Sequence, residues 1–146
     1  MIYLGADHAG YTLKERVKRY LTQQGITWED LGAAKLNIHD DYPDYAALVA
    51  KKVAAGSQHR GLLFCGSGNG MAMTANRIKG IRAAVCWNVY TAKKAVEDNR
   101  ANVISLPARV LKPEEAITVI KAYLAAKPST ISRHMRRIAK IRNLEK

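Results

Sequence analysis

One of the chain's two cysteines opens a glycine-rich loop, in the stretch FCGSGNG of residues 64–70. Cys65 follows an apolar run, and three glycines then alternate with Ser67 and Asn69. Glycines at this spacing let several backbone N–H groups point at one negative centre, and a following helix N-terminus adds about half a positive charge. The stretch therefore predicts a nest for a phosphate or a developing oxyanion beside a thiol.

The residues of this loop leave alternatives open. A tight turn without a ligand also uses glycine, and a cysteine in a strand is commonly inert core. Next to a helix N-terminus, however, the pKa of Cys65 would fall from about 8.5 towards the range useful to a base or nucleophile. The loop matches neither G-x-G-x-x-G nor the P-loop pattern. Cys86 is followed by Trp87 and no glycine nest, so it is predicted to be core.

Two further clusters could bind an anion. Asp7 and His8 stand between glycines directly after an apolar run, although a lone histidine there is often only structural. Arg133 and Arg137 are one helical turn apart, so their guanidinium groups could converge on a phosphate dianion or form a solvated basic face. The four histidines show no ligand-like spacing with one another or with the cysteines, and we expect no metal site.

The elements that would position these residues alternate between strand and helix patterns. The expected strands are 1–6, 26–32, 61–65, 81–87 and 102–107, and the expected helices are 11–25, 41–56, 71–80, 91–100, 112–126 and 131–146. The runs at 61–65 and 81–87 are continuously apolar, as in parallel strands buried on both faces. This order predicts an α/β, Rossmann-like, three-layer fold with a five-stranded parallel sheet flanked by helices. Ligands of such sheets bind beyond the carboxyl ends of the strands.

Length and composition limit the classes of protein to which this chain can belong. At 146 residues the chain is expected to form a single domain, 1–146, with a basic C-terminal helix at about 130–146. Its apolar runs are too short to cross a bilayer, and the N-terminus lacks the pattern of a secretory signal. We expect a cytoplasmic protein with reduced cysteines and no membrane partner.

The net charge of +12 is the compositional outlier and favours anionic partners. Part of the excess lies in the tail, where a solvated basic helix is the simpler interpretation. A nucleic-acid-binding module is an alternative class, but the tail after Tyr123 contains no Phe, Trp or Tyr for base stacking. Steep weakening of binding with salt would identify that function.

Several of these motifs together resemble the ribose-5-phosphate isomerase B and galactose-6-phosphate isomerase family. The resemblance rests on GADHAG at 5–10, DYP at 41–43, CGSGNG at 65–70, AN at 75–76, GIRAA at 80–84 and RH…R at 133–137. It covers almost the whole chain. It implies cofactor-free interconversion of a phosphorylated aldose and ketose through an enediolate, in a homodimer or tetramer whose active sites combine residues of two chains.

The resemblance also implies roles for individual residues. Cys65 would be the base, because the glutamate that other members place just after the loop is Met71 here. Ser67 would move protons between the substrate oxygens. The implied substrate-binding residues are Gly66, Gly68, Asn69 and Gly70 through their amides, His8, Arg133 and Arg137 at the phosphate with Arg109 nearby, Asp7 at the sugar hydroxyls, and Tyr42 and Asn99 lining the pocket.

One position departs from the family pattern. Asp98 stands where the family commonly has the histidine that opens the sugar ring. A carboxylate, with a reference pKa near 3.9 against about 6.5 for imidazole, can accept a proton at pH 7 but seldom has one to donate. The enzyme could therefore be slow on cyclic substrate, another residue such as His134 could substitute, or the substrate could differ from ribose 5-phosphate.

The expected function is interconversion of ribose 5-phosphate and ribulose 5-phosphate, with Cys65 as base and Asp98 at the ring. A hexose 6-phosphate, or another phosphorylated sugar, is the alternative on the same scaffold. A relative that binds sugar phosphates without catalysis is a remoter one.

Overall fold

The computed structural model describes residues 1–145 and contains a five-stranded parallel sheet. Its strands are β1 (Ile2–Ala6), β2 (Trp28–Asp30), β3 (Arg60–Cys65), β4 (Ala83–Val85) and β5 (Val103–Pro107), in the spatial order β2-β1-β3-β5-β4. The chain therefore leaves β1 to form β2 on one side and later returns to form β3 on the other. This reversal makes the loops after β1 and β3 neighbours at the edge where the strands end.

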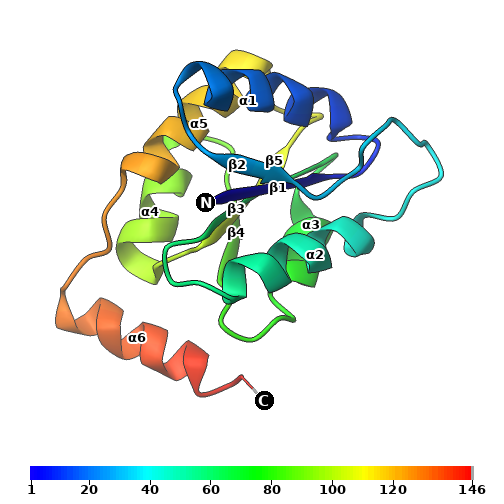
Figure 1. The fold of residues 1–146 in the computed structure, drawn as a ribbon. Coiled ribbons are helices and arrows are strands. Elements are labelled where there is room, and N and C mark those ends of the chain that lie inside the picture. Colours follow the sequence, from blue (N-terminus) through cyan, green and yellow to red (C-terminus); the bar gives the residue numbers. More distant parts are fainter. Residues whose placement is uncertain (146) are drawn as a thin grey trace.

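Helices cover both faces of the sheet (Figure 1). They are α1 (Tyr11–Gln23), α2 (Tyr42–Ala54), α3 (Asn69–Ala75), α4 (Val89–Asn99), α5 (Pro113–Ala125) and α6 (Ser132–Arg142). One core cluster joins α1, α4 and α5 to the sheet, and a second joins α2 and α3 to its other face. This arrangement confirms the predicted three-layer α/β fold.

The alternation of side chains along β3 decides on which face the reactive cysteine lies. Leu62 and Phe64 belong to the core under α1, α4 and α5, whereas Leu63 and Cys65 belong to the core under α2 and α3. Successive side chains of a strand point to opposite faces, so the apolar run of β3 contributes side chains to both cores. Cys65 consequently ends the strand on the side where α3 begins.

The extents of both edge strands were predicted wrongly. The expected buried strand 81–87 is a strand only over Ala83–Val85, and these residues are half-buried. The expected strand 26–32 is reduced to Trp28–Asp30. Each has one neighbouring strand instead of two, so pairing stops early and one side stays partly exposed. The core prediction for Cys86 is confirmed, since this residue is fully buried.

Two expected helices end several residues earlier than predicted, and the others differ by one or two residues at one or both ends. The helix expected at 71–80 is α3, which begins at Asn69 and stops before Asn76. The side chain of Asn76 donates from Nδ2 to the Ala83 carbonyl (2.9 Å) and accepts at Oδ1 from the Ala83 amide (2.8 Å). These two bonds turn the chain into β4. The helix expected at 131–146 ends at Arg142.

The C-terminal helix α6 lies clear of the sheet, at the lower left of Figure 1, where it packs beside α4. His134 is the one buried residue among 132–142. The basic face of α6 is therefore exposed. No helix within residues 1–145 has the length and apolar character needed to span a bilayer.

A close approach between α1 and β3 brings the two neighbouring loops into contact. A Cβ atom on Gly10 would lie 2.1 Å from the carbonyl oxygen of Phe64, so only glycine fits. The amide of Asp7 donates to the same carbonyl (3.3 Å), and the Asp7 side chain accepts from the Gly10 amide (3.1 Å). Residues 7–10 are thus held directly beside the end of β3.

Candidate active site

Cys65 lies at the end of β3 inside a turn of backbone amides. Its side chain is 5% exposed, and its Sγ accepts a hydrogen bond from the Gly68 amide (3.1 Å). Gly68 has φ +83°, a left-handed conformation that favours glycine, and it is the N-cap of α3. The hydroxyl of Ser105, from β5, donates to the Gly68 carbonyl (2.7 Å) and holds the turn in place. The expected nest of amides beside the thiol is therefore present.

The pKa of Cys65 does not follow the expectation. Burial raises the pKa of this thiol above its ordinary value, and the negative charge of Asp7 raises it further. Hydrogen bonds from the amides of Met71 and Gly68 act in the opposite direction but do not offset the burial. The sequence indicated the amide donors, but it gave no measure of how completely the sulfur is removed from water.

The glycines of the loop allow two larger side chains to come close. A Cβ atom on Gly66 would lie 2.9 Å from Nη1 of Arg109, and one on Gly70 would lie 2.5 Å from the ring of Tyr42. Ser67 is exposed, and its Oγ accepts a hydrogen bond from the Asn69 amide (3.3 Å). A guanidinium, a phenol and a hydroxyl thus lie along the loop that follows the thiol.

His8 is held by a residue that the sequence analysis missed. Asp40 accepts from the His8 backbone amide (3.0 Å), and its Oδ1 lies 2.7 Å from Nδ1 of the imidazole. The Asp40 side chain is 4% exposed, against 32% for His8. A buried carboxylate at Nδ1 fixes the ring orientation and leaves Nε2 for a ligand. Asp40 adjoins the DYP motif, but no spacing pattern links it to a histidine 32 residues away.

The segment that carries Asp40 is anchored by a buried lysine. Lys14 is fully buried on α1, and its Nζ donates to Asp30 (2.6 Å) and to the carbonyl of Ala33 (2.6 Å). Burial opposes ionisation of Asp30, but hydrogen bonds from Lys14 and Lys18 outweigh it and lower the pKa of this carboxyl. The anchored charge pair fixes the start of the loop that returns to His8.

The structure divides the predicted site residues into two groups. The Cys65 group consists of Cys65, Gly66, Ser67, Gly68, Asn69, Gly70, Asp7, His8, Tyr42 and Arg109, all at the edge where the strands end. The Asp98 group consists of Asp98, Asn99, Arg133 and Arg137, on α4 and α6.

Two members of the Asp98 group, Asp98 and Arg133, line a separate cavity of about 320 Å³ together with His134. Nδ1 of His134 lies 3.8 Å from Oδ1 of Asp98 and is buried without a hydrogen-bond partner in the described part of the chain. Lys94, one turn earlier on α4, has its Nζ 3.7 Å from the same carboxylate oxygen. Asp98 therefore sits between an imidazole and an ammonium group.

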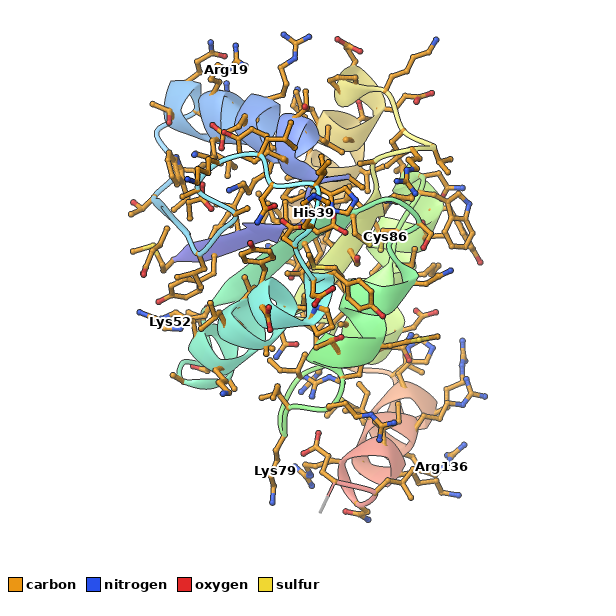
Figure 2. All side chains as sticks on the ribbon, turned by 90° about the vertical axis from the view of Figure 1, so that its right-hand side faces the viewer. Arg19, His39, Lys52, Lys79, Cys86 and Arg136 are labelled. Carbon is orange, nitrogen blue, oxygen red and sulfur yellow. The ribbon has the colours of Figure 1, made fainter. Side chains whose placement is uncertain are left out.

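The topology keeps the two groups apart within one chain. Helix α4 starts after the carboxyl end of β4 and runs back for 11 residues, about 16 Å, to the edge where the strands begin. Asp98 and Asn99 are at its far end, and α6 continues away from the sheet, at the bottom of Figure 2. Arg133 and Arg137 are exposed there. One chain alone does not bring them to Cys65.

Each of the two groups includes one residue of a histidine–aspartate pair. His8 pairs with Asp40, and His134 faces Asp98. Within residues 1–145, no three His, Cys, Asp or Glu side chains come together in a way that could hold a metal ion. The groups offered to a ligand are a thiol, backbone amides, an imidazole and guanidinium groups.

Comparison with known proteins decides the family. The model of the Ribose/Galactose Isomerase family matches residues 2–141. The chain belongs to this family. It is 39% identical to ribose-5-phosphate isomerase B of Mycobacterium tuberculosis (strain ATCC 25618 / H37Rv), over 94% of this chain and 85% of that protein.

Two other relatives bear on the substrate. The chain is 42% identical to D-erythrulose-4-phosphate isomerase of Pectobacterium atrosepticum, over 86% of this chain and 82% of that protein. The structure of ribose-5-phosphate isomerase B from Mycoplasma genitalium with bound ribulose-5-phosphate superposes with a TM-score of 0.94 at 39% identity, covering 99% of this chain and 95% of that one. The predicted family is confirmed.

The charge of Asp7 is expected to control the ionisation of Cys65. Asp7→Asn removes one of the influences that raise the thiol pKa, so the midpoint of Cys65 alkylation by iodoacetamide should move to lower pH. Mass spectrometry of the modified peptide would measure the rate against pH. Cys86 is an internal control, because burial raises its pKa to about 12 and it should stay unmodified. An unchanged midpoint would show that Asp7 does not act on the thiol.

Proposed function

We propose that this protein interconverts ribose 5-phosphate and ribulose 5-phosphate in the cytoplasm, with Cys65 as the catalytic base. The observation that carries the proposal is the Cys65 thiol inside a turn of amide donors at the switch point of the sheet, in a chain of the Ribose/Galactose Isomerase family. The solved relative with bound ribulose-5-phosphate supports the substrate class.

The chemistry follows from the Cys65 group. The thiolate takes a proton from the carbon next to the carbonyl, and the electron pair moves onto the carbonyl oxygen to give an enediolate. The amides of residues 66–70 stabilise that oxygen, and Ser67 moves a proton between the two oxygens. Return of the carbon proton to the neighbouring carbon completes the isomerisation. A raised thiol pKa makes the thiolate a stronger base once it forms.

The substrate phosphate would be bound by an imidazole and guanidinium groups from two chains. His8 and Arg109 belong to the Cys65 group, whereas Arg133 and Arg137 are exposed on α6 at the other edge. We propose that a homodimer completes each site by joining the Cys65 group of one chain to the Asp98 group of its partner. A C2 dimer would form two such sites.

Ring opening is proposed to use the Asp98 carboxylate together with His134. Opening a furanose requires removal of the anomeric hydroxyl proton and donation of a proton to the ring oxygen. The carboxylate accepts the first, and the imidazolium form of His134, whose Nδ1 lies 3.8 Å away, supplies the second. Lys94, Glu97, Lys127 and Arg133 line the same cavity, and Nζ of Lys94 lies 3.7 Å from the Asp98 carboxylate.

A four-carbon sugar phosphate is a second candidate substrate. An aldotetrose 4-phosphate cannot close a five-membered ring, because its C4 oxygen carries the phosphate. It therefore needs no ring opening, and a carboxylate at position 98 would not slow its turnover. The relative called D-erythrulose-4-phosphate isomerase is 42% identical to this chain and favours the same possibility.

Replacement of Cys65 tests the proposed base. Cys65→Ala should abolish ribulose 5-phosphate formation while ribose 5-phosphate binding, measured calorimetrically, stays within about threefold, since the thiol acts on carbon and not on the phosphate. Cys86→Ala is the matched control and should retain turnover, because Cys86 is buried core. Near-full activity of Cys65→Ala would refute the assignment.

Mixing two impaired variants tests the shared site. Cys65→Ala and the double variant Arg133→Ala/Arg137→Ala should each be impaired, the second mainly through a raised KM. Random re-pairing of the two in a C2 dimer restores about a quarter of the sites. Subunit exchange after mild denaturation, followed by a turnover assay at low substrate, would measure this recovery. Activity that stays at the level of the unmixed variants would contradict a site built from two chains.

Substrate comparison separates the two candidates. The wild-type kcat/KM should be higher for ribose 5-phosphate than for erythrose 4-phosphate. His134→Gln should lower the ribose 5-phosphate value by about a hundredfold and spare the four-carbon substrate, because general acid–base catalysis of ring opening is lost. Retained activity on erythrose 4-phosphate would show that the variant is folded, so the two substrates control for each other. A wild-type preference for the four-carbon substrate would favour the second candidate.

A further inference from the structure

A second basic pocket lies at the edge where the strands begin, opposite Cys65. Its volume is about 410 Å³, and the end of α2, the start of β3 and the end of α4 form its walls. Arg60, Arg82 and Arg100 line it together with Ser57 and Asn102. No Asp or Glu of the described residues is among its lining side chains.

Backbone contacts hold Arg82 in this pocket. Its guanidinium donates from Nε and Nη2 to the carbonyl of Arg100 (3.1 and 3.0 Å) and from Nε to that of Asn99 (3.0 Å). The Asn102 side chain accepts from the Arg82 amide (2.9 Å). Nη1 of Arg60 donates to the carbonyl of His59 (2.9 Å). Two of the three arginines are thus positioned by carbonyl oxygens, and neither forms a salt bridge with a carboxylate among the described residues.

Arg100 is held at some conformational cost. It caps α4 in the left-handed conformation (φ 51°), at a position that glycine or asparagine usually occupies. Its Nε is buried and has no hydrogen-bond partner within residues 1–145. A buried donor without an acceptor is unfavourable, so the site lacks an acceptor for this group.

The charges around the pocket repel one another. Burial lowers the pKa of Arg82, and the positive charges of Arg100 and Arg142 lower it further. Glu145 acts in the opposite direction and more strongly than either arginine alone. Its carboxylate accepts from the Gly80 amide (3.2 Å) and lines a neighbouring cavity that Arg82 also lines, and it is not a lining residue of this pocket. An anion in the pocket would relieve the repulsion and supply the missing acceptor.

We propose that Arg60, Arg82 and Arg100 form a second anion-binding site, for a small phosphorylated compound. Guanidinium groups bind phosphate oxygens in pairs of hydrogen bonds, and the volume suits a small ligand. The walls from α2, α4 and Pro128 bound a volume of about 410 Å³, which matches a small molecule and favours it over a polynucleotide. The site is separate from the Cys65 group and does not depend on the isomerase activity.

Local amide signals can distinguish this site from the Cys65 group. In a titration of ¹⁵N-labelled full-length protein with inorganic pyrophosphate, the amides of Gly56, Gly80 and Ala101 report on the pocket, and those of Gly68 and Gly70 report on the Cys65 loop. We expect saturable shifts of the pocket amides with a Kd below about 1 mM at physiological salt. Absence of saturation in this range overturns the proposal, whatever the loop amides do.

A variant that keeps the backbone geometry tests the role of the arginines. Arg100→Asn removes the guanidinium but retains a residue that accepts the left-handed conformation. It should weaken pyrophosphate binding at the pocket amides by about tenfold or more, because a charge-assisted bond is lost. Arg60→Gln should weaken binding in the same way.

The matched control is Arg19→Asn, which makes the same charge change on the exposed face of α1, at the top of Figure 2 and far from α6. It should leave binding unchanged. Equal weakening by Arg19→Asn and Arg100→Asn would show that binding depends only on net charge, and it would contradict the proposed site.

Discussion

The pairing of β1 with β3 is the constraint on which the Cys65 group depends. Ala6 pairs with Phe64 in the parallel register, so the next residues along the two segments, Asp7 after β1 and Cys65 at the end of β3, lie side by side. The contact of Gly10 with the Phe64 carbonyl is so close that a single added methyl group would disturb it. Backbone atoms cannot move aside as a side chain can, and the two loops are therefore held at a fixed distance.

Burial of the thiol has two opposing consequences. It removes Cys65 from water and so raises the pKa of the resting thiol. The same exclusion of water strengthens the hydrogen bonds that the loop amides offer to a developing oxyanion. A site that must stabilise an enediolate benefits from the second effect and accepts the first. Asp7 lies close enough to influence this balance through its charge.

Positive charge is distributed over both edges of the sheet. Arg109 lies beside the Cys65 loop, Arg133 and Arg137 are on α6, and Arg82 and Arg100 line the pocket where the strands begin. Helix α4 connects these regions, because its last residues Asp98 and Asn99 immediately precede Arg100. The carbonyls of Asn99 and Arg100 accept from Arg82, so the second pocket is joined to the Asp98 group through backbone hydrogen bonds.

The sequence by itself determined the layers, the parallel sheet and most members of the Cys65 group, because apolar periodicity and glycine spacing are local properties. Only the tertiary structure decided the rest. Edge positions shortened β2 and β4, burial raised the pKa of Cys65, and a contact across 32 residues joined Asp40 to His8. The direction of α4 placed Asp98 at the opposite edge from Cys65. Solvent exclusion and contacts between distant segments arise from the packing of all elements together, and no local pattern records them.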